Sequence, residues 1–244
     1  MNLKTSSRAG SLRQTAIAVA LGLASLGASA QGLFDGTTFY IGGAYIDVHS
    51  KSAPLSSDPE TLPPGVQAGV RVGDASTVGF GMVVPLGGHY SAELAAGIPP
   101  AHKVYGTLFI SGFGQISTVK QVSPTAFVNY HFSDGGLGLA PFVGLGLNYT
   151  KFTDAHSTAS GDAASGGPTK IKLSDSFGLA VHGGLTYKID QNWSIVSTVA
   201  YADVHSDLRA TTQARLGPGP SEVVRTTRID FRPVVYTLSV GYTF

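Results

Sequence analysis

The chain of 244 residues has no cysteine, few charged residues and, after its first thirty residues, no long apolar run. Without cysteine, an exported domain must draw its stability from a source other than disulfides. Charged residues make up 13% of the sequence, which is about half of the usual globular share. No later run approaches the roughly 20 apolar residues of a membrane-spanning helix. The sequence therefore argues against a protein with helical membrane spans.

The N-terminus has the pattern of a secretory signal peptide. Three basic residues precede an acid-free apolar stretch, 16–26, and small residues follow at 28–30. A membrane anchor is the alternative, but the apolar stretch is short for a spanning helix. The sequence predicts a signal peptide over 1–30, cleavage after Ala30, and a mature domain over 31–244. That domain has a slight excess of acidic residues, so we expect no nucleic-acid partner.

What the mature sequence does contain is alternation of apolar and polar residues in segments of strand length. Each segment is close to the roughly ten residues that a tilted strand needs to cross a bilayer. Glycine is abundant, at 32 residues, and punctuates many of these segments. We find eight such segments: 38–49, 75–86, 89–98, one ending with 124–132, 141–152, 177–187, 193–206 and 233–244.

The connections between these segments alternate in length. Three are short (87–88, 133–139 and 189–192) and four are long (about 50–74, 99–116, 153–174 and 207–232). Short periplasmic turns opposite long external loops are typical of outer-membrane barrels. The predicted fold is therefore all-β: an eight-stranded antiparallel transmembrane β-barrel with short periplasmic turns and long extracellular loops. Because proline donates no ladder hydrogen bond, Pro99 and Pro124 predict weak pairing in the barrel wall.

Four segments together resemble one known family. They read "SAELAAGIPPAHK", "VKQVSPTAFVNYHF", "PFVGLGLNYTKF" and the closing "YTLSVGYTF". In these segments the chain resembles the OmpW family of small outer-membrane proteins. The resemblance implies a narrow, largely hydrophobic lumen and passage of small apolar molecules, which in some relatives are alkanes. The long Pro-rich first loop and the arginines of the fourth loop depart from the family pattern: Arg209, Arg215, Arg225 and Arg228.

Aromatic and apolar residues on the predicted inner faces are candidates for a ligand path through the lumen. The alternative is that these side chains pack a closed core, since eight strands enclose little space. For the strand over 193–206, a lipid-facing girdle is a second alternative, but Asp203 and His205 continue the Trp193 face and favour an inward one. Glu93 is the clearest inward charge, which argues against ion selectivity. The candidate path residues are Phe39, Ile41, Tyr45, Phe127, Phe142, Phe152, Trp193 and Tyr201.

Three Asp-x-His pairs fall at the external ends of predicted strands. They could form a pH- or metal-sensitive rim, because histidine titrates near neutrality and binds transition metals. Isolated pairs on non-adjacent strands supply no ligand geometry, so a solvated polar rim is the favoured interpretation and no metal is expected. The pairs are Asp47 with His49, Asp154 with His156, and Asp203 with His205.

We expect a monomeric channel for passive uptake of small hydrophobic solutes across the outer membrane of a Gram-negative bacterium, with no cofactor. Its other partners would be outer-membrane lipid and the assembly machinery. Solute could exit to the periplasm or sideways into the bilayer. The alternative is a structural or receptor barrel with a filled lumen whose loops bind other molecules. An enzyme is disfavoured because adjacent strand residues, such as His205 and Ser206, point to opposite faces.

The terminal strand generates a first prediction. Tyr242 and the final Phe244 resemble the C-terminal assembly signal of outer-membrane barrels, and the closing strand must pair because an open edge is not tolerated in lipid. Deleting Phe244 should therefore lower the amount of folded protein in the outer membrane before it changes transport per molecule. Quantitative blotting of membrane fractions measures this, and normal membrane levels of the truncated chain would count against it.

Overall fold

The computed structural model describes residues 35–133, 138–214 and 221–244. The predicted signal peptide, residues 1–30, and Arg215 of the fourth long connection lie outside these ranges. Within the ranges given, no helix is long and apolar enough to cross a membrane.

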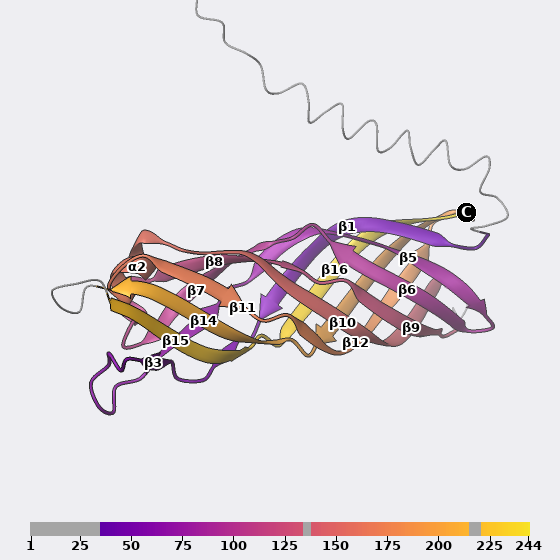
Figure 1. The fold of residues 1–244 in the computed structure, drawn as a ribbon. Helices are drawn as coiled ribbons and strands as arrows, with labels where there is room; N and C mark the ends of the chain where they lie inside the picture. Colours follow the sequence, from indigo (N-terminus) through magenta and orange to yellow (C-terminus); the bar gives the residue numbers. More distant parts are fainter. Residues whose placement is uncertain (1–34, 134–137, 215–220) are drawn as a thin grey trace, which may run out of the picture.

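Eight antiparallel strands close into a barrel, as the sequence predicts (Figure 1). Each strand pairs with the next, and the last pairs with the first from Thr38 opposite Thr243 to Val48 opposite Pro233. The short turns at 87–88 and 189–192 lie at the same end of the barrel as the C-terminus. In order around the barrel, the strands are β1 (Thr38–Val48), β5 (Ala75–Gly87), β6 (Tyr90–Gly97), β9 (Thr125–His131), β10 (Leu139–Ser157), β12 (Ser176–Lys188), β13 (Trp193–Ala202) and β16 (Pro233–Thr243).

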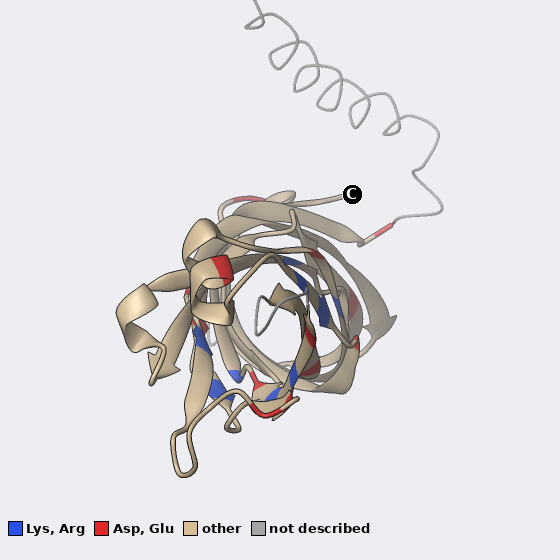
Figure 2. Ribbon diagram, turned by 60° about the vertical axis from the view of Figure 1, so that its left-hand side comes forward, with Lys and Arg blue, Asp and Glu red and all other residues tan. Residues whose placement is uncertain are grey.

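The four long connections lie at the end opposite the short turns, as predicted, and they consist largely of strands that the sequence pattern does not reveal. They continue the barrel strands outward and pair in the order β4–β7–β8–β10–β11–β14–β15, with β2 and β3 added to β15. The wall of the barrel therefore extends well beyond the membrane, and Figure 2 shows the ring of strands from this side. The added strands are β2 (Lys51–Ser52), β3 (Ser56–Asp58), β4 (Ala68–Val72), β7 (Ala101–Leu108), β8 (Gln115–Val122), β11 (Thr169–Leu173), β14 (His205–Ala214) and β15 (Ser221–Asp230).

Two short helical elements also occupy the long connections. A 3₁₀ turn, η1 (Ser111–Phe113), links β7 to β8, and α2 (Ala159–Ser165) links β10 to β11. The Thr158 hydroxyl accepts a hydrogen bond from the Gly161 amide at the start of α2, and Gly166 closes the helix in the left-handed region at φ 84°. Glycine and proline in "SGDAASGGP" thus mark the end of a helix and the turn that follows it.

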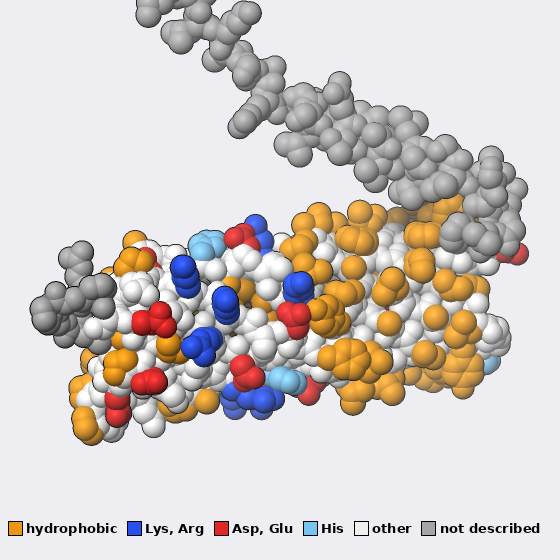
Figure 3. Space-filling view, viewed as in Figure 1, with side chains coloured by type: hydrophobic (Ala, Val, Ile, Leu, Met, Phe, Trp, Pro, Cys, Tyr) orange, Lys and Arg blue, Asp and Glu red, His pale blue; other side chains and the backbone are white. Residues whose placement is uncertain are grey.

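An apolar band covers the visible face of the half of the barrel with the short turns (Figure 3), and all eight barrel strands carry exposed apolar side chains. On β10, for example, Leu145 and Leu147 are exposed on the outer face, whereas Asn148 points into the barrel and is buried. On β16, Tyr236, Leu238 and Val240 form the matching outward stripe. Charged side chains gather on the other half of the visible face. This distribution is that of a barrel whose apolar band faces lipid.

Aromatic side chains gather where the first and last strands meet. The Trp193 and Tyr242 rings lie 5.0 Å apart between centroids, and the Tyr242 and Phe244 rings lie 4.9 Å apart. The Phe39 ring packs edge-on against Phe244 at 5.7 Å. These side chains connect β13, β16 and β1 at the end with the short turns, in the place of an interfacial aromatic girdle.

The backbone ladder of the barrel wall is interrupted between two neighbouring chain segments. One segment forms β6 and then β7, and the other forms β8 and then β9. Pairing of β6 with β9 ends at Ala95 opposite Thr125, and pairing of β7 with β8 resumes at Ala101 opposite Lys120. Residues 96–100 and 121–124 between these points have no ladder partner across this boundary. We call this interruption the wall seam. It contains both prolines for which weak pairing is predicted, and the prediction is confirmed.

Closure between β1 and β16 generates a second prediction. A Cβ added at Gly42 would overlap the backbone of Leu238 and Ser239, whereas one added at Gly43 meets nothing within 4 Å. Overpacking costs about 1–3 kcal/mol. Gly42→Ala should therefore lower the free energy of unfolding by about that amount, and Gly43→Ala should leave it unchanged. Urea unfolding in lipid vesicles measures both, and equal stabilities would contradict the close approach of these strands.

Candidate functional site

Four of the predicted path residues lie on the outer surface, so their prediction as lumenal was wrong. The exposed fractions are 60% for Ile41, 45% for Tyr45, 46% for Trp193 and 40% for Tyr201. Phe39 shares the outer face of β1 with Ile41 and packs against Phe244 in the aromatic cluster at the barrel end, so its prediction as lumenal was wrong as well. The inner face of β1 is instead formed by Tyr40, Gly42, Ala44, Ile46 and Val48.

The error has a physical cause. Asp203 was used to predict an inward face because charge avoids the hydrocarbon region, and Asp47 shares a strand face with Ile41 and Tyr45 in the same way. Both aspartates lie where their strands leave the apolar band, at the end of β1 and just after β13. A carboxylate at that height can point outward into water. Its presence therefore says nothing about the direction of the other side chains on its face.

The three predicted phenylalanines do point inward and are buried. Phe127 and Phe142 lie within the membrane half, and Phe152 lies higher on β10. The Phe127 ring stacks on the His182 imidazole, with centroids 3.8 Å apart, and the Phe142 ring meets His182 edge-on at 5.4 Å. Their placement is as predicted, while their role in a ligand path remains a prediction.

A hydrogen-bonded cluster of four polar side chains crosses the lumen on the side of the short turns. The Tyr40 hydroxyl donates to Glu93 Oε1 at 2.6 Å, and Asn129 Nδ2 donates to Glu93 Oε2 at 2.7 Å. His182 Nε2 lies 2.7 Å from Asn129 Oδ1 and 3.7 Å from Glu93 Oε2. Asn129 is 1% exposed and Glu93 is 7% exposed. We call these four residues the polar plug.

Glycines make room for the polar plug on neighbouring strands. A Cβ at Gly144 would overlap Asn129 and His182, one at Gly81 would overlap the Tyr40 ring, and one at Gly184 would overlap Phe142. Large and small residues therefore alternate around the lumen, as in other small barrels. The inward glycines in this part of the barrel do not leave an open path, because the plug and its rings fill the space.

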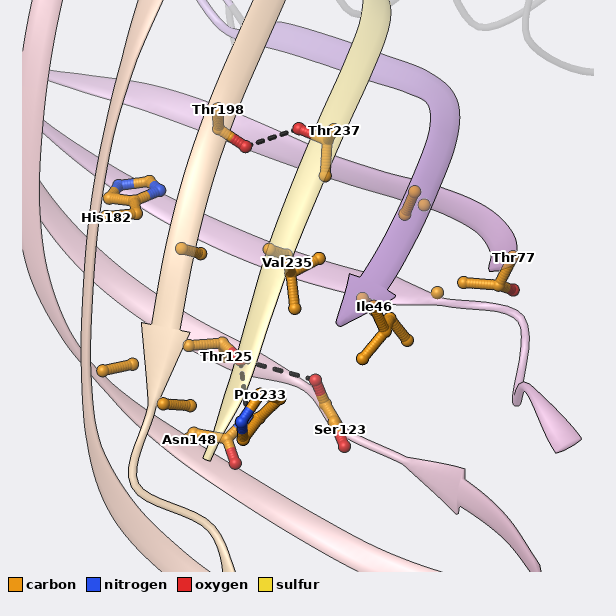
Figure 4. A pocket seen from close by; sticks show the side chains of 18 of the residues that line it. Ile46, Thr77, Ser123, Thr125, Asn148, His182, Thr198, Pro233, Val235 and Thr237 are labelled. Atoms are coloured by element: carbon orange, nitrogen blue, oxygen red, sulfur yellow. Dashed lines mark hydrogen bonds between the residues drawn. The ribbon is translucent and has the colours of Figure 1, made fainter. Parts of the chain in front are cut away.

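A cavity of about 160 Å³ lies above the polar plug (Figure 4). Glu93 and His182 form part of its floor, and Thr125, Thr198 and Thr237 line its sides. The lining includes residues from both sides of the wall seam: Ala95, Ala96, Gly97, Ile98 and Pro100 on one, and Gln121, Ser123 and Thr125 on the other. Ile98 is exposed on the outer surface. The cavity thus reaches the barrel wall at the point where the backbone ladder is interrupted.

Above this cavity, buried apolar side chains fill the barrel where it leaves the membrane. The Phe152 and Phe231 rings stack with centroids 4.8 Å apart and pack with Val72 and Ile229. We call this layer the apolar plug; its members are Ile46, Val48, Val70, Val72, Val104, Val119, Phe152, Val204, Leu208, Ile229 and Phe231. A second cavity, of about 320 Å³, lies on its outer side among the extended strands and is called the vestibule.

The three Asp-x-His pairs do not come together into one cluster, although two of them have an internal contact. His49 Nε2 lies 3.7 Å from Asp47 Oδ2, and His156 Nδ1 lies 3.6 Å from Asp154 Oδ1. Lys120 Nζ lies 2.8 Å from Asp154 Oδ2 and holds the pKa of that carboxyl below its usual range. His205 and Asp203 have no mutual contact of this kind. Within the described ranges, no three histidine or acidic side chains are placed to hold a metal ion.

Sequence reasoning missed several residues that form these layers. Tyr40 and Asn129 sit on strands that were found correctly, but their partners come from other strands. Phe231 lies in a connection that was taken as loop. His102 on β7 is buried, its Nδ1 2.8 Å from the Gly73 carbonyl oxygen, and its Nε2 has no partner in the described residues. Ser206 is also buried, and its hydroxyl donates to the Ser174 carbonyl oxygen at 2.7 Å and not to His205.

The closed ladder, the apolar band and the layered lumen define an outer-membrane β-barrel of the small, eight-stranded class. The OmpW family model matches residues 39–244, which is most of the chain. The protein belongs to the OmpW family.

Individual relatives agree with this assignment. Outer membrane protein W of Escherichia coli K12 is 31% identical over 180 residues, which cover 74% of this chain and 78% of the relative. Outer membrane protein W of Vibrio cholerae is 32% identical over 157 residues, covering 63% and 67%. The crystal structure of OprG from Pseudomonas aeruginosa superimposes with a TM-score of 0.73 at 25% identity, covering 86% of this chain and 96% of OprG.

The polar plug generates a third prediction. In the double variant Glu93→Ala, His182→Ala, the first change removes the acceptor of Tyr40 and Asn129 and the second removes the donor to Asn129 Oδ1. An unsatisfied buried group costs about 1–3 kcal/mol. We expect lower stability and entry of water and ions into the lumen. Conductance in planar bilayers should therefore rise above that of the parent protein. The matched control is Glu222→Ala on the exposed surface of β15, which should change neither property; a double variant with unchanged conductance would show that another layer closes the lumen.

Proposed function

We propose that this barrel is a passive uptake channel for small hydrophobic molecules and that solute leaves sideways through the wall seam. The observation that carries the proposal is the lumenal cavity, whose lining includes Ala96, Gly97, Ile98 and Pro100 on one side of the wall seam and Gln121 and Ser123 on the other. Its lining is mainly apolar and hydroxylic. An apolar solute gains little from a fully hydrated pore but is stabilised by removal of its surface from water.

The polar plug supports lateral exit over exit to the periplasm. An apolar solute moving straight on would have to displace charged and hydrogen-bonded groups without replacing their bonds, which is unfavourable. Sideways, it meets Ala96 and Ile98 at the seam and then the hydrocarbon of the bilayer. The lower free-energy route for such a solute is therefore through the wall.

Entry from outside requires passage of the apolar plug. This layer separates the two cavities, yet it consists of side chains and not of backbone. Rotation of Phe152 and Phe231 between side-chain rotamers would open a transient path for an apolar solute, while water and ions gain no polar contacts there. The channel would work by diffusion down a gradient and needs no cofactor.

The filled-lumen alternative also has an observation in its favour. Both plugs are well packed, so a structural or receptor barrel whose extended outer strands bind other molecules would look similar. Uptake separates the two functions. Cells with the barrel should take up a labelled apolar solute faster than cells without it. Equal rates would contradict the channel function and support a structural or receptor barrel.

We further propose that residues 1–30 direct export and are cleaved, that the outer-membrane assembly machinery inserts the chain, and that it works as a monomer. The barrel closes on itself within one chain, which supports the last point.

The lumenal cavity generates a fourth prediction. Gly79 lines it, and a Cβ there would make ordinary contacts of 3.7 Å with Ala44 Cβ and 3.8 Å with the Ala96 carbonyl oxygen. Gly79→Leu should therefore fill the cavity and reduce uptake of an apolar solute by about tenfold, equivalent to about 1.4 kcal/mol. Gly43→Leu adds the same side chain on the outer face and should leave uptake unchanged. Rates normalised to membrane levels measure both; wild-type uptake by Gly79→Leu would remove this cavity from the route.

A further inference from the structure

The vestibule has the size and lining of a small-molecule site. Its volume of about 320 Å³ is at the lower end of the range of about 300–1,000 Å³ for ligand pockets. Apolar side chains from several connections line it, including Leu55, Phe109, Ile110 and Leu208. A groove of this kind is typical of sites that bury an apolar chain and fix it with a few polar groups.

Arg225 is the charged side chain in this lining, among the residues that the structure describes. It alternates on β15 with outward residues and points inward, beside the buried Val223 and Thr227. Its Nη1 donates to Thr212 Oγ1 at 3.2 Å. Its Nη2 donates to Thr61 Oγ1 at 3.2 Å and to the Ser165 carbonyl oxygen at 3.3 Å.

No counter-charge accompanies this arginine. All three acceptors are neutral, and none of the ion pairs found within 4 Å in the described ranges includes Arg225. The sequence 215–220 has no acidic residue that could supply one. Two of the five guanidinium N–H donors remain beyond the three bonds above. Loss of hydration at this half-buried position lowers the pKa of Arg225 from its ordinary value. A bound anion would therefore stabilise the charged guanidinium.

We propose that the vestibule binds an amphiphilic carboxylate, with its head on Arg225 and its aliphatic chain along Leu55, Ile110 and Leu208. A carboxylate matches the planar fork of a guanidinium and forms charge-assisted hydrogen bonds with it. Thr61 lines the vestibule beside Arg225, and its hydroxyl can donate to the second oxygen after a rotation. The site's use as an entry point rests on the proposed channel function; the binding itself does not.

A purely structural role for Arg225, tying the first and third connections to β15, is the competing explanation. It predicts that loss of the guanidinium changes folding and changes binding of charged and neutral amphiphiles alike. A binding role predicts a loss that is specific to the ionised head. The comparison of decanoate with 1-decanol, which share a ten-carbon chain, therefore separates the two.

The experiment uses the full chain in nanodiscs of zwitterionic lipid at pH 8, with empty nanodiscs as the background. Equilibrium binding of radiolabelled decanoate and 1-decanol is measured for the parent, Arg225→Met, Arg225→Lys and Arg209→Met. Arg209 lies on the outward face of the neighbouring strand β14 and controls for general electrostatic attraction. The heat-dependent shift in gel mobility reports folding of each variant.

We expect saturable decanoate binding that falls about tenfold in Arg225→Met, as loss of a charged hydrogen bond implies. Arg225→Lys should retain most of it, Arg209→Met should match the parent, and decanol should not distinguish the variants. Parent-like decanoate binding by folded Arg225→Met, an equal loss in Arg209→Met, or no saturable binding to the parent would each overturn the proposal. If decanoate binds as expected but apolar solute uptake is absent, the site stands and the channel function fails. If apolar solute uptake is present but decanoate binding does not depend on Arg225, the channel function stands and the proposed site fails.

Discussion

Complete pairing of the backbone in lipid is the constraint on which the rest of this structure depends. In hydrocarbon an unpaired N–H or carbonyl group costs several kcal/mol, so the strands must close with β16 on β1. Glycine at position 42 allows these two strands to approach, and aromatic rings pack against one another at the end of the β1–β16 pair. The wall seam at residues 96–100 and 121–124 stands out against this constraint, because pairing lapses beside a cavity.

Closure also determines the lumen. Eight strands enclose so little space that a ring or polar side chain on one strand requires glycine on the next. The result is a series of layers: the polar plug, a small cavity, the apolar plug around Phe152 and Phe231, and the vestibule beneath the outermost strands. Each layer differs in chemistry from the next. This order of layers is compatible with an apolar solute that loses its hydration in the vestibule and leaves through the wall seam above the polar plug.

Much of the fold could be predicted from the sequence, because alternation is a local property of a strand. All eight barrel strands and the buried positions of Glu93, Phe127 and Phe142 follow from it. The faces of β1 and β13 were assigned wrongly, since an aspartate indicates direction only if its depth in the membrane is known. The outer strands were missed because each barrel strand other than β10 is interrupted where it leaves the membrane, and the alternation of the barrel strand stops there.

The sequence by itself determined the class of protein and the eight strands of the barrel, since these depend on residues close together in the chain. Only the tertiary structure decided which side chains meet across the lumen. Tyr40, Glu93, Asn129 and His182 come from four strands, and their bonds exist because register and shear place them at one height. The same is true of Arg225, which is one of several arginines in the sequence and becomes distinct only because the barrel turns it inward without a counter-charge.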